Sequence, residues 1–226
     1  MPHHPAHRRS PPAATDSRPV AEPLPVAAGQ RLLCLGDSIT AATPGYVDIL
    51  EQAVGHARRD LALQWIKAGV SGNTIRDLEA RLDRDVLAQH PTWVTICIGT
   101  NDSIGAARGQ PSGVPLPEFE ARYAVLLARL RAAAITPILL TIPVVGSDAP
   151  DSPIPDPQPY NAAIRALATR EQLRLVDLYQ AFYDVYARAA AYKQIVSLST
   201  DGIHPNSPGH TLIARTIILQ LGLLQR

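Results

Sequence analysis

The sequence is short of the residues that mark several protein classes. It has only two cysteines, Cys34 and Cys97, which excludes a disulfide framework, and each lies in a short apolar run where we expect a buried free thiol. Aromatic residues make up only 5% of the chain, and they form no cluster of the kind that marks a sugar-binding platform. The core must therefore be built mainly from aliphatic side chains.

A surplus of charge of one sign is also lacking. The 226 residues carry a formal net charge of +1, and no run of basic residues breaks this balance. Binding to nucleic acid or to an anionic membrane depends on such a run or on a basic face. We therefore expect neither nucleic acid nor an anionic membrane surface as a partner.

Long hydrophobic runs are absent too. No apolar stretch reaches the roughly 18 residues of a membrane-spanning helix, so stable membrane insertion is not expected. Residues 1–28 hold seven of the 21 prolines and lack the apolar stretch of a signal peptide. We predict that this segment is disordered, because it buries too little surface to offset the entropy of ordering. A cytoplasmic location is expected, with secretion left open if the start site is misassigned.

From Gln30 onward, short apolar runs alternate with amphipathic stretches of helical period. Five runs are predicted as strands, at residues 31–35, 61–66, 93–98, 136–142 and 173–177. Predicted helices begin at Tyr46, Thr74, Pro117, Tyr160 and Ser207. Strands that alternate with helices indicate βαβ units and a parallel sheet. We predict an α/β fold with five parallel strands in the flavodoxin-like order 2-1-3-4-5.

Polar residues follow the first and third predicted strands, which flank the switch point of such a sheet. Ligands bind open α/β sheets at this point, outside the carboxyl ends of the strands. Ser38 follows the first strand, and its hydroxyl becomes nucleophilic when a neighbouring base takes its proton. The alternative is that Asp37 and Ser38 only cap a helix.

Further candidate groups lie in three other loops. Asp201 and His204 are three residues apart, a spacing that lets the carboxylate hold one imidazole nitrogen while the other faces a serine. Gly72 offers an unhindered backbone N–H, and the Asn101 amide offers two donors for a developing oxyanion. The alternatives are an ordinary turn glycine, an Asx turn and a surface loop.

These motifs occur together and in a characteristic order. The four blocks are Gly36-Asp37-Ser38-Ile39, Gly72 within GVSGN, Gly99-Thr100-Asn101-Asp102 and Asp201-Gly202-Ile203-His204-Pro205-Asn206. Over about residues 30–221 the sequence thereby resembles the SGNH hydrolases, also called GDSL esterases/lipases. The resemblance implies a three-layer α/β/α sandwich and a single hydrolase domain over residues 29–226.

The resemblance also implies a serine esterase. It assigns Ser38 as nucleophile, His204 as general base and Asp201 as the carboxylate that orients it. The oxyanion hole would comprise the backbone N–H groups of Ser38 and Gly72 and the Asn101 side chain. The implied reaction hydrolyses a small-molecule carboxylic ester, with short-chain or acetyl esters favoured, through an acyl-enzyme on Ser38. No metal and no organic cofactor is needed.

Several alternatives stay open at this point. Lysophospholipids and thioesters are possible substrates, and a non-catalytic binding module and a metal-dependent phosphoesterase are less well supported. Lys67 stands where family members often carry asparagine, so we expect it to alter the loop after the second strand. Residues 144–159, which contain five prolines, and residues 183–199 are expected to border the pocket. The oligomeric state cannot be inferred from the sequence.

Overall fold

A computed structural model describes residues 22–143 and 154–225. Its parallel sheet has the order β2-β1-β3-β4-β5, and the predicted α/β fold and strand order are confirmed. The strands are β1 (Arg31–Gly36), β2 (Gln64–Gly69), β3 (Trp93–Cys97), β4 (Thr136–Leu140) and β5 (Arg174–Val176). The helices are α1 (Ser38–Ala41), α2 (Tyr46–Ala57), α3 (Ile75–Asp85), α4 (Thr100–Ala107), α5 (Leu116–Ala132), α6 (Gln158–Arg170), α7 (Leu178–Ala191) and α8 (Ser207–Leu221).

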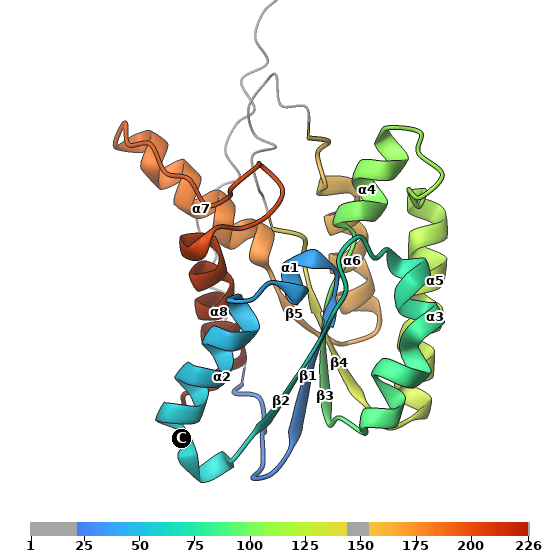
Figure 1. The fold of residues 1–226 in the computed structure, drawn as a ribbon, viewed down its shortest axis with the longest axis vertical. Helices are drawn as coiled ribbons and strands as arrows, with labels where there is room; N and C mark the ends of the chain where they lie inside the picture. Colours follow the sequence, from blue (N-terminus) through green and yellow to red (C-terminus); the bar gives the residue numbers. More distant parts are fainter. Residues whose placement is uncertain (1–21, 144–153, 226) are drawn as a thin grey trace, which may run out of the picture.

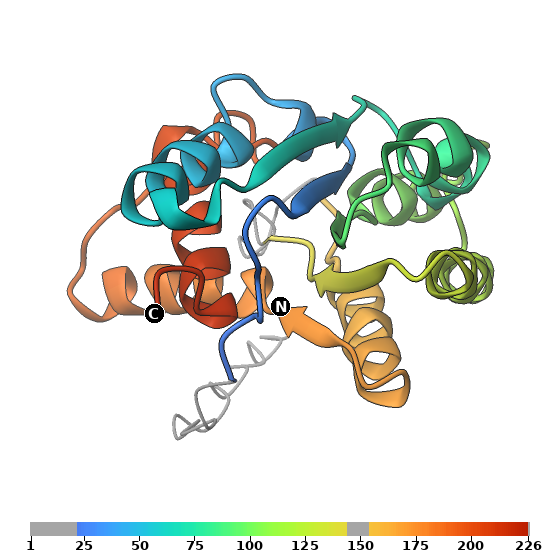
Figure 2. The same ribbon diagram turned by 90° about the horizontal axis from the view of Figure 1, so that it is seen from below.

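The sheet is the middle layer of a sandwich. Helices α2, α7 and α8 cover one face, and α3, α5 and α6 cover the other (Figures 1 and 2). Each face has its own apolar cluster, with Leu50 and Phe182 on the first and Leu82 and Leu126 on the second. Full burial of side chains of this size stabilises the fold by roughly 1.5–3 kcal/mol each. The three-layer arrangement implied by the family resemblance is confirmed.

Helix α3 shows how local signals specify an element. Its capping box is formed, with the Thr74 backbone N–H donating to Asp77 at 2.8 Å. Ile75, Leu78 and Leu82 follow at helical spacing and are fully buried. The capping box therefore specifies where the helix begins, and the apolar stripe specifies which face is buried.

The second strand lies further along the chain than predicted. Residues Arg59–Leu61 form a short 3-10 turn, and pairing with β1 begins at Gln64 opposite Arg31. The strand ends at Gly69, where a Cβ would lie only 2.2 Å from the Ala41 backbone nitrogen. The missing side chain therefore lets α1 pack directly on the end of β2.

Two helices were missed in the sequence. Thr100, Asn101 and Asp102, which the sequence analysis places in a loop after the third strand, instead begin α4 (Thr100–Ala107), and residues 178–191 form α7. Asp177, which was assigned to the fifth strand, instead caps α7 by accepting a hydrogen bond from the Gln180 backbone N–H at 3.1 Å. None of the helices in the described part of the chain is both long and apolar enough to cross a membrane.

The N-terminal segment packs onto the domain earlier than the boundary placed at residue 29. Leu24 is only 3% exposed and belongs to the core beside α8. Its backbone N–H donates to the Leu221 carbonyl at 2.7 Å, and Arg174 donates to the Pro23 carbonyl. Disorder predicted for residues 1–28 is therefore wrong for residues 22–28. Residues 1–21 lie outside the described part of the chain.

We expect Leu24→Ala to lower the free energy of unfolding by about 2–3 kcal/mol, because it leaves a cavity against α8. Leu219→Ala is the matched control, since Leu219 is on α8 but 54% exposed. Urea unfolding of both variants measures the effect. Equal stability of the two variants would show that residues 22–28 do not contribute to the core.

Candidate active site

Ser38 lies at the carboxyl end of β1, as the first residue of α1. The preceding residue, Asp37, is fully buried and accepts a hydrogen bond from the Ile39 backbone N–H at 3.0 Å. Asp37 thus caps α1, as the capping alternative proposed. Ser38 is half-buried, and its hydroxyl takes no part in the cap.

The Ser38 hydroxyl meets a histidine 166 residues further along the chain. Ser38 Oγ lies 3.1 Å from His204 Nε2, and His204 Nδ1 lies 2.7 Å from Asp201 Oδ2. The other Asp201 carboxylate oxygen accepts the backbone N–H groups of Ile203 at 2.9 Å and His204 at 2.7 Å. The three residues singled out in the sequence therefore form one continuous chain of contacts.

These contacts keep the Asp201 carboxylate ionised. Burial raises the pKa of Asp201, but hydrogen bonds from the backbone and ring of His204 outweigh this and lower it to about 2. The His204 and Asp201 side chains are 46% and 52% exposed, so solvent screens the pair. The charged carboxylate fixes which ring nitrogen of His204 faces Ser38.

The loop that carries Asp201 and His204 is closed by its own backbone. Ser199 and Pro205 form an antiparallel bridge, and the Thr200 backbone N–H donates to the His204 carbonyl at 2.9 Å. Directly after it, Asn206 caps α8 by accepting the Gly209 backbone N–H at 3.0 Å. The histidine is thus held between a tight loop and a helix start.

The three groups that the sequence analysis assigns as oxyanion donors follow the ends of β1, β2 and β3. Within residues 22–143 and 154–225, the backbone N–H groups of Ser38 and Gly72 donate to no protein acceptor. Gly72 has φ +80°, a conformation that favours glycine. The Asn101 amide donates one hydrogen to the Asn73 carbonyl at 2.9 Å, which fixes the side chain beside Gly72.

Two further carboxyls, those of Asp37 and Asp102, are buried next in sequence to Ser38 and Asn101. Burial raises the pKa of Asp37 to about 6 and that of Asp102 to about 7. Asp102 Oδ1 accepts the Ile75 backbone N–H at 2.9 Å, which ties the first turn of α4 to the start of α3. The second oxygen of each carboxyl has no hydrogen-bond partner among the described residues.

Lys67 acts on a different loop from the one expected. It lies in β2, and its ammonium contacts both oxygens of Asp48, at 2.7 and 2.9 Å. It also donates to the Ala42 carbonyl at 3.0 Å and the Thr43 hydroxyl at 2.9 Å. Lys67 therefore fixes the segment that follows α1, and hence the end of the helix that begins at Ser38.

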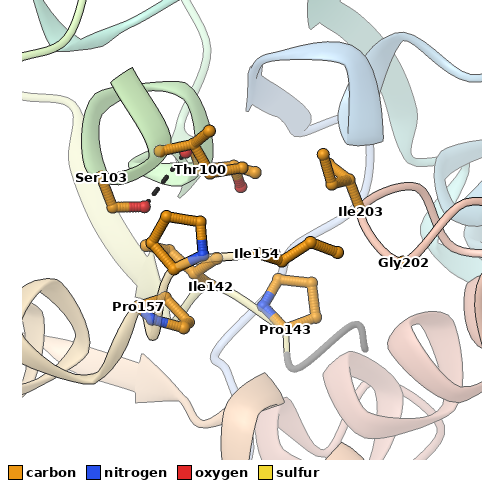
Figure 3. Close-up of a pocket in the computed structure, with 10 residues that line it drawn as sticks. Thr100, Ser103, Ile142, Pro143, Ile154, Pro157, Gly202 and Ile203 are labelled. Atoms are coloured by element: carbon orange, nitrogen blue, oxygen red, sulfur yellow. Dashed lines mark hydrogen bonds between the residues drawn. The ribbon is translucent and has the colours of Figure 1, made fainter. Parts of the chain in front are cut away.

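An apolar hollow of about 260 Å³, partly open to solvent, is lined by residues next in sequence to His204 and to Asn101 (Figure 3). It is lined by Thr100, Ser103, Ile104, Ile142, Pro143, Ile154, Pro155, Pro157, Gly202 and Ile203. Two of these residues directly precede His204, and Thr100 directly precedes Asn101. The second half of the proline-rich segment 144–159 thus borders the site, as expected, while residues 144–153 lie outside the described part of the chain.

Comparison with known proteins settles the family. The sequence profile of the GDSL-like Lipase/Acylhydrolase family matches residues 34–212. The chain belongs to this family. It is therefore a carboxylic ester hydrolase of the SGNH (GDSL) type, and the sequence-based resemblance is confirmed.

This hydrolase has similar relatives among proteins of known activity and structure. An acetylxylan esterase of Geobacillus stearothermophilus is 28% identical over 214 residues, which cover 87% of this chain and 96% of the relative. A crystal structure of that esterase, Axe2, matches with a TM-score of 0.76 and 30% identity over the same shares. LAE5, a hydrolase from the metagenome of Lake Arreo, matches with a TM-score of 0.78 and 30% identity over 88% and 98% of the two chains.

A more distant relative has a different acyl substrate class in its name. The thioesterase 1/protease 1/lysophospholipase L1 of Escherichia coli is 26% identical over 196 residues, 86% of this chain and 85% of the relative.

Structures of Axe2 include catalytic mutants with alanine at a serine, at an aspartate and at a histidine three residues after that aspartate. The spacing of Asp201 and His204 in this hydrolase is the same.

Arg81 is the residue of this site region that the sequence analysis missed. It lies on α3 between the buried residues Leu78 and Leu82, and its side chain contacts the ends of β1 and β2. An arginine on the apolar stripe of a helix needs internal partners, because burial removes its hydration. The position of Arg81 in the apolar stripe was therefore the sequence signal that could have identified it as a buried arginine with internal partners.

The buried Asp102 carboxyl gives this hydrolase a stability that falls as pH rises. Unfolded, the group ionises near 3.8, whereas the folded pKa is about 7, so the folded state holds a proton that the unfolded state has lost between these values. Asp102→Asn keeps an acceptor for the Ile75 N–H and removes this loss. We expect the stability of Asp102→Asn relative to the wild type to be greater at pH 8 than at pH 4. This increase in relative stability is at most on the order of 1 kcal/mol per unit of pKa shift.

Urea unfolding of the wild type and of Asp102→Asn at pH 4, 6 and 8 measures this difference. A variant whose free energy of unfolding follows pH in parallel with the wild type would contradict the assignment.

Proposed function

We propose that this hydrolase cleaves carboxylic esters with small acyl groups through an acyl-enzyme on Ser38. The observation that carries the proposal is the continuous contact from Ser38 Oγ through the His204 ring to Asp201, at 3.1 and 2.7 Å. These distances are within reach of proton transfer. The catalytic mutants of Axe2 support the same three residue types, with the aspartate and histidine in the same spacing of three residues.

In the first half of the reaction, Ser38 Oγ attacks the ester carbonyl carbon while His204 Nε2 takes the hydroxyl proton. Asp201 stabilises the imidazolium that results and keeps Nδ1 as the donor toward itself. The tetrahedral intermediate collapses, the bond to the alcohol oxygen breaks, and His204 returns its proton to the leaving alcohol. Water then attacks the acyl-enzyme by the same route and releases the acid.

The negative charge that develops on the carbonyl oxygen needs preorganised donors. The backbone N–H groups of Ser38 and Gly72 have no other acceptor in the described part of the chain. The Asn101 amide has a second hydrogen besides the one that it donates to Asn73. We therefore assign these three groups to the oxyanion hole.

The apolar hollow supports a preference for small acyl groups. No described residue that lines it is charged, and its volume of about 260 Å³ includes space open to solvent. Rigid proline residues form part of its wall, so the hollow adapts little to a long chain. The likeness to an acetylxylan esterase supports an acetyl group as the acyl part.

A second candidate is hydrolysis of thioesters or lysophospholipids. The similarity to a bacterial thioesterase/lysophospholipase favours it, and it uses the same serine, histidine and oxyanion donors. The two functions differ in acyl length and leaving group, so a substrate panel separates them.

The first test is hydrolysis of p-nitrophenyl esters from acetyl to decanoyl by the wild type and Ser38→Ala. We expect the wild type to prefer acetyl to butyryl esters and Ser38→Ala to lose at least about 10³-fold in kcat, because the nucleophile is gone. Acetylated xylo-oligosaccharide and a palmitoyl thioester complete the panel. Equal activity of the two proteins would exclude Ser38 as nucleophile, and an optimum at decanoyl would favour the second candidate.

Acyl length should respond to the wall of the hollow. Ile154 contributes to that wall, and its Cδ1 lies where a side chain at Gly202 would be. We expect Ile154→Ala to move the optimum by about two carbons toward longer esters, because it enlarges the hollow. Val125→Ala, on the exposed side of α5, is the control. An unchanged chain-length profile in Ile154→Ala would show that the acyl group binds elsewhere.

A further inference from the structure

Arg81 stands out as a buried charge outside the catalytic contacts. Its side chain is only 8% exposed although it lies in the middle of α3. A guanidinium in such a place loses its hydration and must be matched by internal acceptors. The identity of those acceptors indicates what the residue does.

Four hydrogen bonds leave the Arg81 guanidinium. Nη2 donates to the carbonyls of Gly36 at 2.9 Å and Ala68 at 3.0 Å. Nε donates to the Asn73 side-chain oxygen at 2.7 Å, and Nη1 donates to Asp85 at 2.9 Å. Only the last of these bonds stays within α3.

The other three acceptors lie close in sequence to two of the groups assigned as oxyanion donors, Ser38 and Gly72. The Gly36 carbonyl ends β1 two residues before Ser38, and the Ala68 carbonyl lies in β2 just before the loop of Gly72. Asn73 directly follows Gly72, and its backbone carbonyl holds the Asn101 amide. One planar guanidinium thus contacts the ends of β1 and β2 and reaches Asn101, on α4, through Asn73.

We propose that Arg81 is the positioning residue of the oxyanion hole. This inference rests on the proposed function of Ser38, Gly72 and Asn101. Donors stabilise an oxyanion only when they lie within about 2.7–3.1 Å of it, and a displacement of about 1 Å can cost 10²-fold in rate. Arginine suits this role because its donors have a fixed planar arrangement, whereas a lysine is a single flexible point charge.

The test compares two arginines of one helix. Arg84, three residues after Arg81, is 78% exposed and pairs with the same Asp85 carboxylate, at 2.5 Å. We expect Arg81→Met to lower kcat and kcat/KM for p-nitrophenyl acetate equally, by about tenfold to a hundredfold, with KM unchanged. Arg84→Met should retain the wild-type kcat. Activities are measured at a temperature where all proteins are folded by circular dichroism.

A double-mutant cycle separates positioning from general destabilisation. Asn101→Ala alone is expected to lower kcat by about 10²–10³-fold. If Arg81 holds Asn101 in place through Asn73, Arg81→Met should cost at least threefold less in the Asn101→Ala background than in the wild type. The same fold-loss in both backgrounds would overturn the proposal, because an indirect loss of stability does not depend on Asn101.

If Arg81→Met does not fold, Asn73→Ala tests the same role of Arg81. Asn73→Ala removes only the acceptor of Arg81 Nε and leaves the backbone carbonyl that holds Asn101. It should lower kcat by about three- to tenfold with KM unchanged. Wild-type kcat in Asn73→Ala, or in a folded Arg81→Met, would refute the role of Arg81 while the esterase function stands. A wild type and Arg84→Met without esterase activity would instead refute the proposed function itself.

Discussion

The chemistry of this hydrolase depends on the parallel pairing of β1 with both β2 and β3. The pairs Gly36 with Gly69 and Gly36 with Cys97 bring three strand ends to one level. Because the strands are parallel, the loops that follow them leave the sheet at the same edge. Ser38, Gly72 and Asn101 are thereby gathered at that edge. At Gly69 the pairing also requires a residue without a side chain, since α1 lies against its backbone.

This gathering has a cost in stability. Asp37 and Asp102 are buried carboxyls whose pKa values burial raises to about 6 and about 7, and each has one oxygen without a partner among the described residues. Both nevertheless organise the site, since Asp37 caps the helix of Ser38 and Asp102 joins α4, which carries Asn101, to α3. Departures from the general rule that buried polar groups are satisfied concentrate at functional sites. The remaining structure offsets them with two well-packed apolar faces.

What the sequence predicts correctly are features that local signals encode. The α3 capping box and apolar stripe, and the motifs around Ser38 and His204, are readable because their residues are neighbours or have fixed spacing. The start of β2 was wrong because its pairing with Arg31, not its own apolar run, decides where it begins. Helix α7 was missed because Asp177 was counted with a strand although its carboxylate caps the helix. The partners of Arg81 lie up to 45 residues away, so only the folded chain reveals them.

The partial exposure of His204 and Asp201 has a consequence for substrate geometry. About half of each side chain faces water, whereas the hollow whose wall includes Gly202 and Ile203 is lined mainly by isoleucine and proline. If an ester binds with its acyl part in the hollow, as proposed, its alcohol part lies on the exposed side of His204 and Asp201. In that arrangement the walls of the hollow would limit the size of the acyl part, and the exposed side would set no such limit on the alcohol part. A small acyl group attached to an extended polymer meets both conditions, because the chain can lie across the surface while a single substituent reaches the serine.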